Sequence, residues 1–115
     1  MTSKIQTGND GETLAARYLV AKGYEIVARN YRYGRAEIDL IVKKGNWLVF
    51  VEVKTRASEA FGFPEEFVDK EKESNILFAA ENYMYLINWN GNVRYDIISV
   101  LGPSKDIMHF EDAFY

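Results

Sequence analysis

The chain has 115 residues, of which 48% are apolar, a size and composition that predict one compact domain spanning residues 1–115. It contains no cysteine, which excludes disulfide bonds and thiolate metal sites and favours a reducing cytoplasm. No segment approaches the roughly 20 apolar residues that a membrane-spanning helix needs, so we expect a soluble protein without membrane contact. The formal charge of -3 argues against binding nucleic acid by overall charge, so a polyanion would need a local basic patch.

The predicted elements follow one another in the order αβββαβ. A first helix is predicted over 8–22, where the apolar residues share one face and Gly23 follows. A second helix is predicted over 69–87, with apolar positions at Ile76, Ala80, Tyr83 and Ile87. Strands are predicted at 24–32, 36–43, 47–55 and 93–101, with a short strand or extended edge from Met108 onward. This order predicts an α/β fold with a mixed central sheet flanked by helices.

The strands at 36–43 and 47–55 are predicted to form a β-hairpin. Gly45 and Asn46 favour a two-residue turn, because both accept the positive φ angles of tight turns. In that register Lys44 pairs with Trp47. Counting back along both strands places Asp39 opposite Glu52, and Glu37 opposite Lys54.

Alternation of side chains divides this hairpin into two faces. One face is wholly aliphatic and carries Ile38, Leu40, Val42, Val49, Val51 and Val53. The other face carries Glu37, Asp39, Glu52 and Lys54 together with Ile41 and Phe50. Because Ile41 and Phe50 are apolar, we expect a helix to cover this face and to bury its charges partly. Buried charges require partners.

Asp39 and Glu52 are like charges at directly opposed positions, which destabilises a sheet unless something compensates them. A divalent cation would do so, because Mg²⁺ is commonly held by one or two carboxylates and keeps water and phosphate oxygens at its other positions. Lys54, on the same face, could then bind a phosphate or stabilise the charge that develops on it. The alternative is a solvated hairpin face on which Glu37 and Lys54 form an ordinary cross-strand ion pair.

The spacing of Asp39 and Glu52-Val53-Lys54, after an N-terminal helix, resembles the PD-(D/E)xK phosphodiesterase signature. Longer strings accompany it: GE (11–12), ARNYR (28–32), AEIDLI (36–41), VFVEVKTR (49–56), FGFPEEFV (61–68), AAENY (79–83), RYDII (94–98) and the terminal DAF. Together they resemble the YraN-like family of small bacterial proteins, predicted endonucleases similar to archaeal Holliday junction resolvases. The resemblance covers nearly the whole chain and implies a restriction-endonuclease-like core.

The resemblance implies a catalytic site of four residues. Asp39 and Glu52 would be ligands of Mg²⁺ or Mn²⁺, and Lys54 would be the catalytic lysine. Glu12 matches the helical glutamate that joins the acidic cluster in related nucleases, as an outer ligand or a water-positioning base. Without the resemblance, Glu12 is interpreted as a favourable charge at a helix N-terminus, worth about 0.3–1 kcal/mol.

Basic residues that could bind nucleic acid fall in three places. Arg29, Arg32 and Arg35 are interleaved with tyrosines, a composition that suits phosphate contacts and base stacking and equally suits a solvated strand end. Arg56 continues the VEVK motif, and Lys72 lies in the second helix, where related proteins often carry a basic run.

Two further residues receive no catalytic role from the sequence. Asp96 is interpreted as structural rather than as a third ligand. His109 is the only histidine and is given no role, so neither a histidine-rich metal site nor a serine triad is predicted.

The predicted function is that of a metal-dependent endonuclease that hydrolyses DNA, with branched DNA as a candidate substrate. DNA is favoured over RNA by the resemblance, although the residues themselves do not distinguish the two. Similarity to resolvases also implies a homodimer, for which Trp47, Trp89 and the C-terminal edge are available. The alternative is a catalytically weak or inactive nuclease-fold module that binds nucleic acid or a protein partner. The acidic net charge favours that alternative. The second helix also favours it, because it has Glu71, Glu73 and Ser74 around Lys72 where related proteins often carry a basic run.

Overall fold

The computed structural model describes residues 4–56, 70–102 and 104–114. The predicted order of elements is confirmed, and the short strand predicted near the C-terminal end is present over Asp106–Phe110. Neither helix of these ranges is long and apolar enough to cross a bilayer. The helices are α1 (Lys4–Ala21) and α2 (Lys70–Ile87), and the strands are β1 (Glu25–Tyr33), β2 (Ala36–Lys44), β3 (Trp47–Arg56), β4 (Asn92–Leu101) and β5 (Asp106–Phe110).

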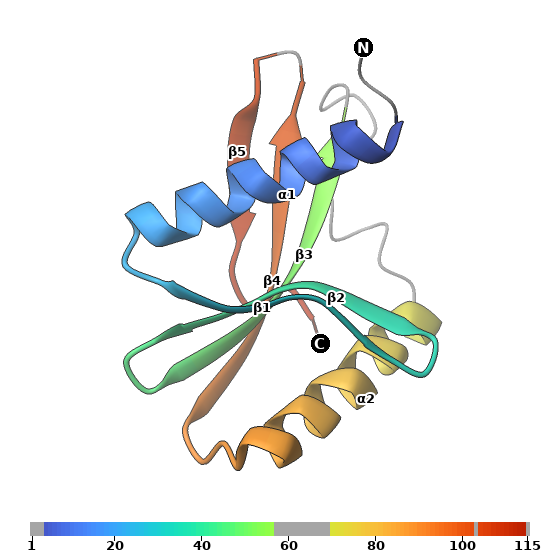
Figure 1. Cartoon of the computed structure of the whole chain (residues 1–115), viewed down its shortest axis with the longest axis vertical. Helices are drawn as coiled ribbons and strands as arrows, with labels where there is room; N and C mark the ends of the chain where they lie inside the picture. Colours follow the sequence, from blue (N-terminus) through green and yellow to red (C-terminus); the bar gives the residue numbers. More distant parts are fainter. Residues whose placement is uncertain (1–3, 57–69, 103, 115) are drawn as a thin grey trace.

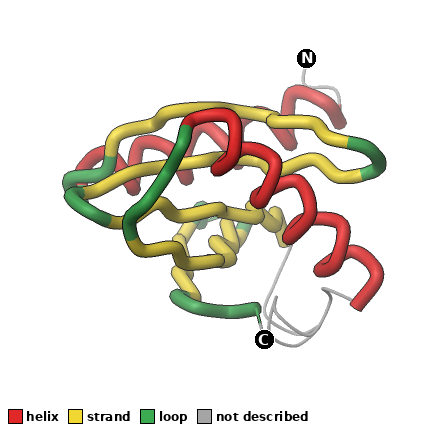
Figure 2. The backbone as a smooth tube through the Cα atoms, turned by 90° about the horizontal axis from the view of Figure 1, so that it is seen from below, coloured by secondary structure: helices red, strands yellow, loops and turns green. Residues whose placement is uncertain are grey.

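The strands form one mixed five-stranded sheet in the order β1-β2-β3-β4-β5. Strands β1, β2 and β3 are antiparallel, β3 and β4 are parallel, and β5 returns antiparallel to β4. A parallel pair needs a long crossover connection, and α2 lies within the one between β3 and β4. Figure 1 shows α1 and α2 at opposite sides of the twisted sheet, and Figure 2 shows the sheet between them.

Each face of the sheet buries its own apolar cluster. Under α1, Leu19 packs with Leu40 and Val51. Under α2, Ile76 packs with Phe50. All of these side chains are buried, so the predicted division of the hairpin into two faces is confirmed at its centre.

The predicted hairpin register is confirmed from the Lys44–Trp47 pair to the Leu40–Val51 pair. Gly45 supplies the positive φ of the turn, at 57°. Beyond Leu40, β2 no longer pairs with β3, although it continues to pair with β1 as far as Ala36. Ile38, which alternation placed with Leu40, packs instead in the cluster under α2, because β2 twists away from β3 at this point.

The helix α1 begins at Lys4, four residues before its predicted start at Gly8. Glu12 therefore lies about two turns inside the helix. The interpretation of Glu12 as a charge at a helix N-terminus is wrong, because the positive end of a helix dipole acts only within the first turn. The position of Glu12 needs another explanation, which lies in what α1 contacts.

Gly11 allows α1 to approach β3 closely. This residue is buried, and a Cβ added to it would collide with Oγ1 of Thr55. A glycine in the middle of a helix costs about 1 kcal/mol relative to alanine, so its presence here is a packing requirement. Because Glu12 follows directly, the close approach at Gly11 sets how Glu12 stands relative to the strand that carries Glu52.

We expect Gly11→Ala to have opposite effects on stability in two backgrounds. In the wild-type protein, overpacking against Thr55 typically costs about 1–3 kcal/mol and outweighs the helix-propensity gain, so the free energy of unfolding should fall by about 1 kcal/mol. In a Thr55→Ala background the collision is absent, and the same change should stabilise the protein by up to about 1 kcal/mol. Urea unfolding of all four proteins measures the coupling, and equal effects in both backgrounds would contradict the contact.

Candidate functional site

Asp39 lies where β2 and β3 part, just beyond the Leu40–Val51 pair. It is only 8% exposed, and its Oδ2 accepts a hydrogen bond from the backbone N–H of Val53 at 2.7 Å. A side-chain oxygen thus satisfies a strand N–H that the backbone of β2 no longer reaches. The hydrogen bond fixes the Asp39 carboxylate beside Glu52.

The two carboxylate oxygens of Glu52 have different surroundings. Oε1 lies 3.2 Å from Nζ of Lys72 and 3.6 Å from Nζ of Lys54. Oε2 is buried and has no hydrogen-bond partner within the described residues. A buried polar atom without a partner is costly. Oε2 is therefore available to a ligand that supplies positive charge.

The charge of Glu52 disfavours the charged form of Asp39. Burial raises the pKa of Asp39, and the charge of Glu52 raises it further, to about 7, against the hydrogen bond from Val53. Glu12 and Glu37 add smaller effects in the same direction. Near neutral pH Asp39 therefore holds a proton part of the time. A bound cation would favour the fully ionised pair.

Lys54 and Lys72 bring two ammonium groups to the same carboxylate. The Lys54 side chain, from β3, is 12% exposed, whereas the Lys72 side chain, from the start of α2, is 41% exposed. Burial lowers the pKa of Lys54, and Lys72 lowers it further, although Glu52 raises it. Burial also lowers the pKa of Lys72, but its hydrogen bond with Lys54 and the charge of Glu52 raise it above the usual value. Lys54 is thus the more readily deprotonated amine.

Glu12 approaches the acidic pair from α1. Burial raises its pKa, and the charge of Glu37 raises it further, while Asn30 and Arg29 lower it. The charge of Glu52 adds a smaller increase, which places Glu12 within electrostatic range of the pair. The structure therefore brings Asp39, Glu52 and Lys54 together, and it places Glu12 on α1 next to Gly11, which approaches Thr55 of β3.

A pocket of about 410 Å³ lies over the acidic pair, between β2 and α2. Its volume falls within the range of about 300–1,000 Å³ that is usual for small-ligand sites. Glu37, Glu71 and Asn75 were not predicted as site residues. Glu37 had a signal, because it lies on the predicted polar face, whereas the other two depend on how α2 is rotated. The pocket is lined by Arg35, Ala36, Glu37, Asp39, Glu52, Glu71, Lys72, Asn75 and Ile76.

The acidic pair has the donor atoms that Mg²⁺ and Mn²⁺ prefer, since Asp39 and Glu52 both supply carboxylate oxygens. The unpartnered Oε2 of Glu52 fits such an ion. Among the residues that the structure describes, no three His, Cys, Asp or Glu side chains are grouped to hold a metal. The arrangement thus fits a cation with two carboxylate ligands and water at the remaining positions. A role for Glu12 as a third ligand stays a prediction.

The predicted basic residues do not form one patch. Arg35 lines the pocket, but Arg32 forms an ion pair with Glu37, with Nε and Oε2 2.7 Å apart. Glu37 of β2 therefore has its charged partner on the neighbouring strand β1, where Arg32 lies directly opposite it. The alternative cross-strand pair between Glu37 and Lys54 is wrong, because Lys54 lies beside Glu52 instead.

The remaining predicted nucleic-acid contacts lie on β1 and at the end of β3. Arg29 is exposed on β1 near Glu12. Arg56 is half-buried, and its Nη1 donates to the backbone oxygen of Thr55 at 3.3 Å. Tyr31, which the sequence offered as a stacking residue, is partly buried and packs against the cluster under α2, where its hydroxyl donates to Oδ1 of Asn82.

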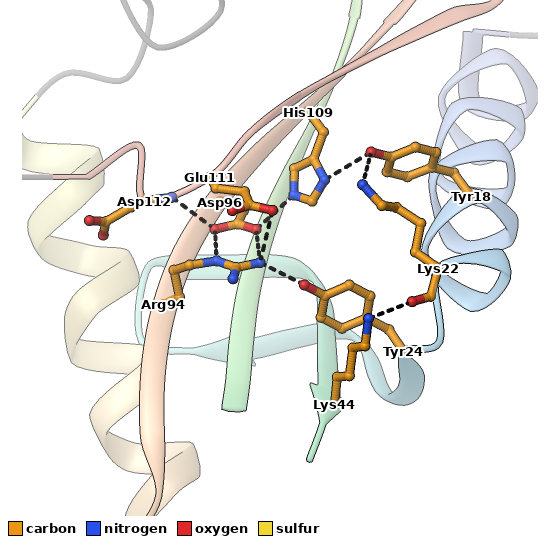
Figure 3. Close-up of polar contacts among 9 residues, drawn as sticks. All are labelled: Tyr18, Lys22, Tyr24, Lys44, Arg94, Asp96, His109, Glu111 and Asp112. Carbon is orange, nitrogen blue, oxygen red and sulfur yellow. Dashed lines mark hydrogen bonds and ion pairs between the residues drawn. The ribbon is translucent and has the colours of Figure 1, made fainter. Parts of the chain in front are cut away.

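A second polar cluster lies under α1 and centres on Asp96, which is fully buried (Figure 3). Asp96 accepts two hydrogen bonds from Arg94, each at 2.8 Å, and one from the backbone N–H of Asp112 at 3.0 Å. Nε2 of His109 lies 2.7 Å from Asp96, and Nδ1 lies 3.1 Å from the hydroxyl of Tyr18. The cluster joins α1, β4, β5 and the C-terminal segment. Asp96 is thus structural, as interpreted, and His109, which received no role, belongs to the same cluster.

We expect Asp96→Asn to lower stability at pH 7 by about 3–5 kcal/mol, because Arg94 loses its charged buried partner. Burial alone raises the pKa of Asp96, but His109, Arg94 and Asp112 outweigh burial and hold the pKa below its usual 3.8. A lowered folded-state pKa gives stability that is present above about pH 4 and is lost as the pH falls through the folded value. The free energy of unfolding of Asp96→Asn should therefore fall less steeply than that of the wild type as the pH is lowered below about 4.

Urea unfolding at pH 7 and at several pH values between about 4 and 2 tests this expectation. Asp106→Asn, at an exposed aspartate of β5, is the matched control and should change stability by less than about 0.5 kcal/mol. Equal stabilities of Asp96→Asn and wild type at pH 7 would contradict the structural role.

The fold and the site define an α/β protein whose mixed sheet places two buried carboxylates and a lysine where two strands part. The chain belongs to the uncharacterised protein family UPF0102, which matches residues 11–100. The matched range includes Glu12, Asp39, Glu52 and Lys54. All of the predicted catalytic residues therefore lie in the part that the family shares.

Three relatives illustrate the extent of the similarity. The UPF0102 protein of Cytophaga hutchinsonii is 44% identical over 95% of this chain and 96% of the relative. That of Flavobacterium psychrophilum is 44% identical over 100% of this chain and 98% of the relative. That of Chlorobaculum tepidum is 50% identical over 93% of this chain and 90% of the relative. The similarity thus extends over nearly the full length of each pair.

Proposed function

We propose that the protein is a divalent-metal-dependent endonuclease of the PD-(D/E)xK type that hydrolyses phosphodiester bonds in DNA. The observation that carries this proposal is the buried Asp39–Glu52 pair, in which Oε2 of Glu52 has no partner among the described residues and Lys54 lies beside Oε1. Groups whose pKa values are shifted by burial and by a specific charged neighbour are concentrated at functional sites. The pocket above the pair gives a substrate access to it.

In this proposal each catalytic residue has a distinct role. Asp39 and Glu52 hold Mg²⁺ or Mn²⁺, which, when bound, supplies an activated water and neutralises charge on the phosphate. Lys54, with its lowered pKa, binds the attacked phosphate or accepts a proton from the attacking water. Glu12, from α1, orients that water. Arg35, on the wall of the pocket, binds a neighbouring phosphate.

Branched DNA is the substrate class that the resemblance to resolvases favours, and symmetric cutting of a junction requires two active sites. A homodimer therefore belongs to the proposal. Of the two tryptophans offered for its interface, Trp47 is 42% exposed, whereas Trp89 packs under α2. Trp47 is thus the better candidate for the contact.

A second candidate function is a nuclease-fold module that binds nucleic acid or a protein partner without cutting. One observation favours it: Nζ of Lys72 already lies 3.2 Å from Oε1 of Glu52, so a cation would have to bind beside an ammonium group. The two candidates differ in whether the site binds a metal. That difference can be measured without knowing the substrate.

We expect Mn²⁺ to raise the midpoint of thermal unfolding of the wild-type protein. The midpoints of the variants Asp39→Asn and Glu52→Gln should not change when Mn²⁺ is added. A ligand that binds only the folded state at ten times its Kd stabilises that state by about 1.4 kcal/mol, which corresponds to a shift of several degrees. Without metal, Asp39→Asn should be at least as stable as wild type at pH 8, because it removes the repulsion between the two acids. Thermal unfolding with and without Mn²⁺ measures both effects.

The control for this measurement is Glu25→Gln, at an exposed glutamate of β1 that does not line the pocket. It should keep the full response to Mn²⁺. A response that persists in both Asp39→Asn and Glu52→Gln would place the metal elsewhere and contradict the proposed site.

We expect cleavage of at least one DNA structure in the presence of Mg²⁺ or Mn²⁺, and loss of that cleavage in the variants Asp39→Asn and Lys54→Met. Removal of a group that transfers a proton typically slows a reaction by about 10²- to 10⁴-fold, which sets the loss expected for Lys54→Met. Gel assays on single-stranded, duplex, flap and four-way-junction DNA measure the rates, with Glu25→Gln as control. Metal binding at the acidic pair without any cleavage would favour the binding module.

A further inference from the structure

A second groove lies between α1 and β1. It has a volume of about 490 Å³ and shares no lining residue with the pocket over the acidic pair. Neither the motif resemblance nor the catalytic proposal uses Arg17, which contributes to this groove. The groove is lined by Thr13, Ala16, Arg17, Val20, Ala21 and Arg29.

The chemistry of the groove combines an apolar surface with two guanidinium groups. Arg17, from α1, and Arg29, from β1, are both exposed, and Val20, which also lines the groove, is 55% exposed. Among the side chains that the structure describes, no acidic one belongs to the lining. Guanidinium groups bind phosphate oxygens through paired N–H donors, and apolar side chains can receive a sugar or a base.

The elements that form this groove also reach the strands of the acidic pair. Gly11 of α1 packs closely against Thr55, which follows Lys54 in β3. Arg29, which lines the groove, pairs with Leu40, which follows Asp39 in β2. Arg17 lies five residues beyond Glu12 in α1, about 7.5 Å along the helix axis. A strand that presents a phosphate to the acidic pair can therefore continue along α1 into the groove.

We propose that the α1–β1 groove binds the single-stranded segment that flanks the scissile phosphate. Arg17 and Arg29 bind its phosphates, and Val20 and Ala21 contact a sugar or base. The inference rests on the proposed function, because the acidic pair defines where the attacked phosphate lies. A single strand is favoured over a duplex, because two arginines on a chain of net charge -3 provide little of the broad basic surface that duplex binding requires.

The test is the binding of a labelled oligothymidylate to the full-length protein in EDTA, measured by fluorescence anisotropy at several salt concentrations. Arg17→Gln should raise Kd about five- to tenfold and should reduce the slope of log K against log salt by about 0.7, the value for one phosphate contact on a single strand. Arg17→Lys, which keeps the charge, should retain the slope. Lys105→Gln, at an exposed lysine outside the groove, should change neither quantity.

Three outcomes would overturn the groove. The first is no binding of the oligonucleotide by wild type, and the second is an equal effect of Arg17→Gln and Lys105→Gln. The third is binding of polyglutamate with the same dependence on Arg17, which would assign the groove to an acidic peptide. If Arg17→Gln weakened the binding of a blunt duplex by the same factor as that of the single strand, the choice of a single strand would be overturned.

Failure of this inference and failure of the proposed function are distinguishable, because the binding test requires neither metal nor cleavage. The variant Arg17→Gln should also keep the thermal stabilisation by Mn²⁺, because Arg17 does not line the pocket over the acidic pair. Dependence of binding on Arg17 without any response of wild type to Mn²⁺ would support the groove and count against the nuclease. A response to Mn²⁺ with binding that does not depend on Arg17 would overturn the groove alone.

Discussion

The hydrogen bond from the N–H of Val53 to Oδ2 of Asp39 is the interaction on which the site depends. It forms where β2 stops pairing with β3, and it replaces a backbone partner with a carboxylate. The N–H of Val53 thus keeps a hydrogen-bond partner although the strand pairing has ended, and the partner is an acid held beside Glu52. The hydrogen bond holds the carboxylate in place, while burial and the charge of Glu52 raise the pKa of Asp39 against it.

A comparison of the two buried aspartates shows what distinguishes a stabilising carboxylate from one that is available to a ligand. Asp96 is held by both donors of Arg94, by His109 and by a backbone N–H, and its pKa is lowered. Asp39 has one backbone donor and a carboxylate neighbour, and its pKa is raised to about 7. The fold therefore uses one face of the sheet to satisfy an aspartate fully and leaves the other aspartate in need of positive charge.

The sequence predicted the fold well because its strongest signals are local. The turn at Gly45 fixed the register, and the register placed Asp39 beside Glu52. The end of the hairpin pairing could not be predicted, because the twist of β2 follows from packing against β1 and α2 rather than from alternation, so Ile38 was assigned to the wrong face. The start of α1 was also wrong, since propensity does not determine where a helix stabilised by packing begins. The partners of Asp96 come from distant segments, and no spacing in the chain indicates them.

Lys72 shows which part of the site the spacing of residues predicts and which part it does not. Lys72 precedes the buried Ile76 by four residues, so helical periodicity places it on the face of α2 that meets the sheet. Periodicity does not say that it meets Glu52, because that depends on the depth at which α2 packs. Once there, the more exposed Lys72 and the more buried Lys54 share Oε1 and leave Oε2 without a partner in the described chain. Two ammonium groups thus reduce the charge of the acidic pair without satisfying it, so the site tolerates the absence of a cation and retains an oxygen that can bind one.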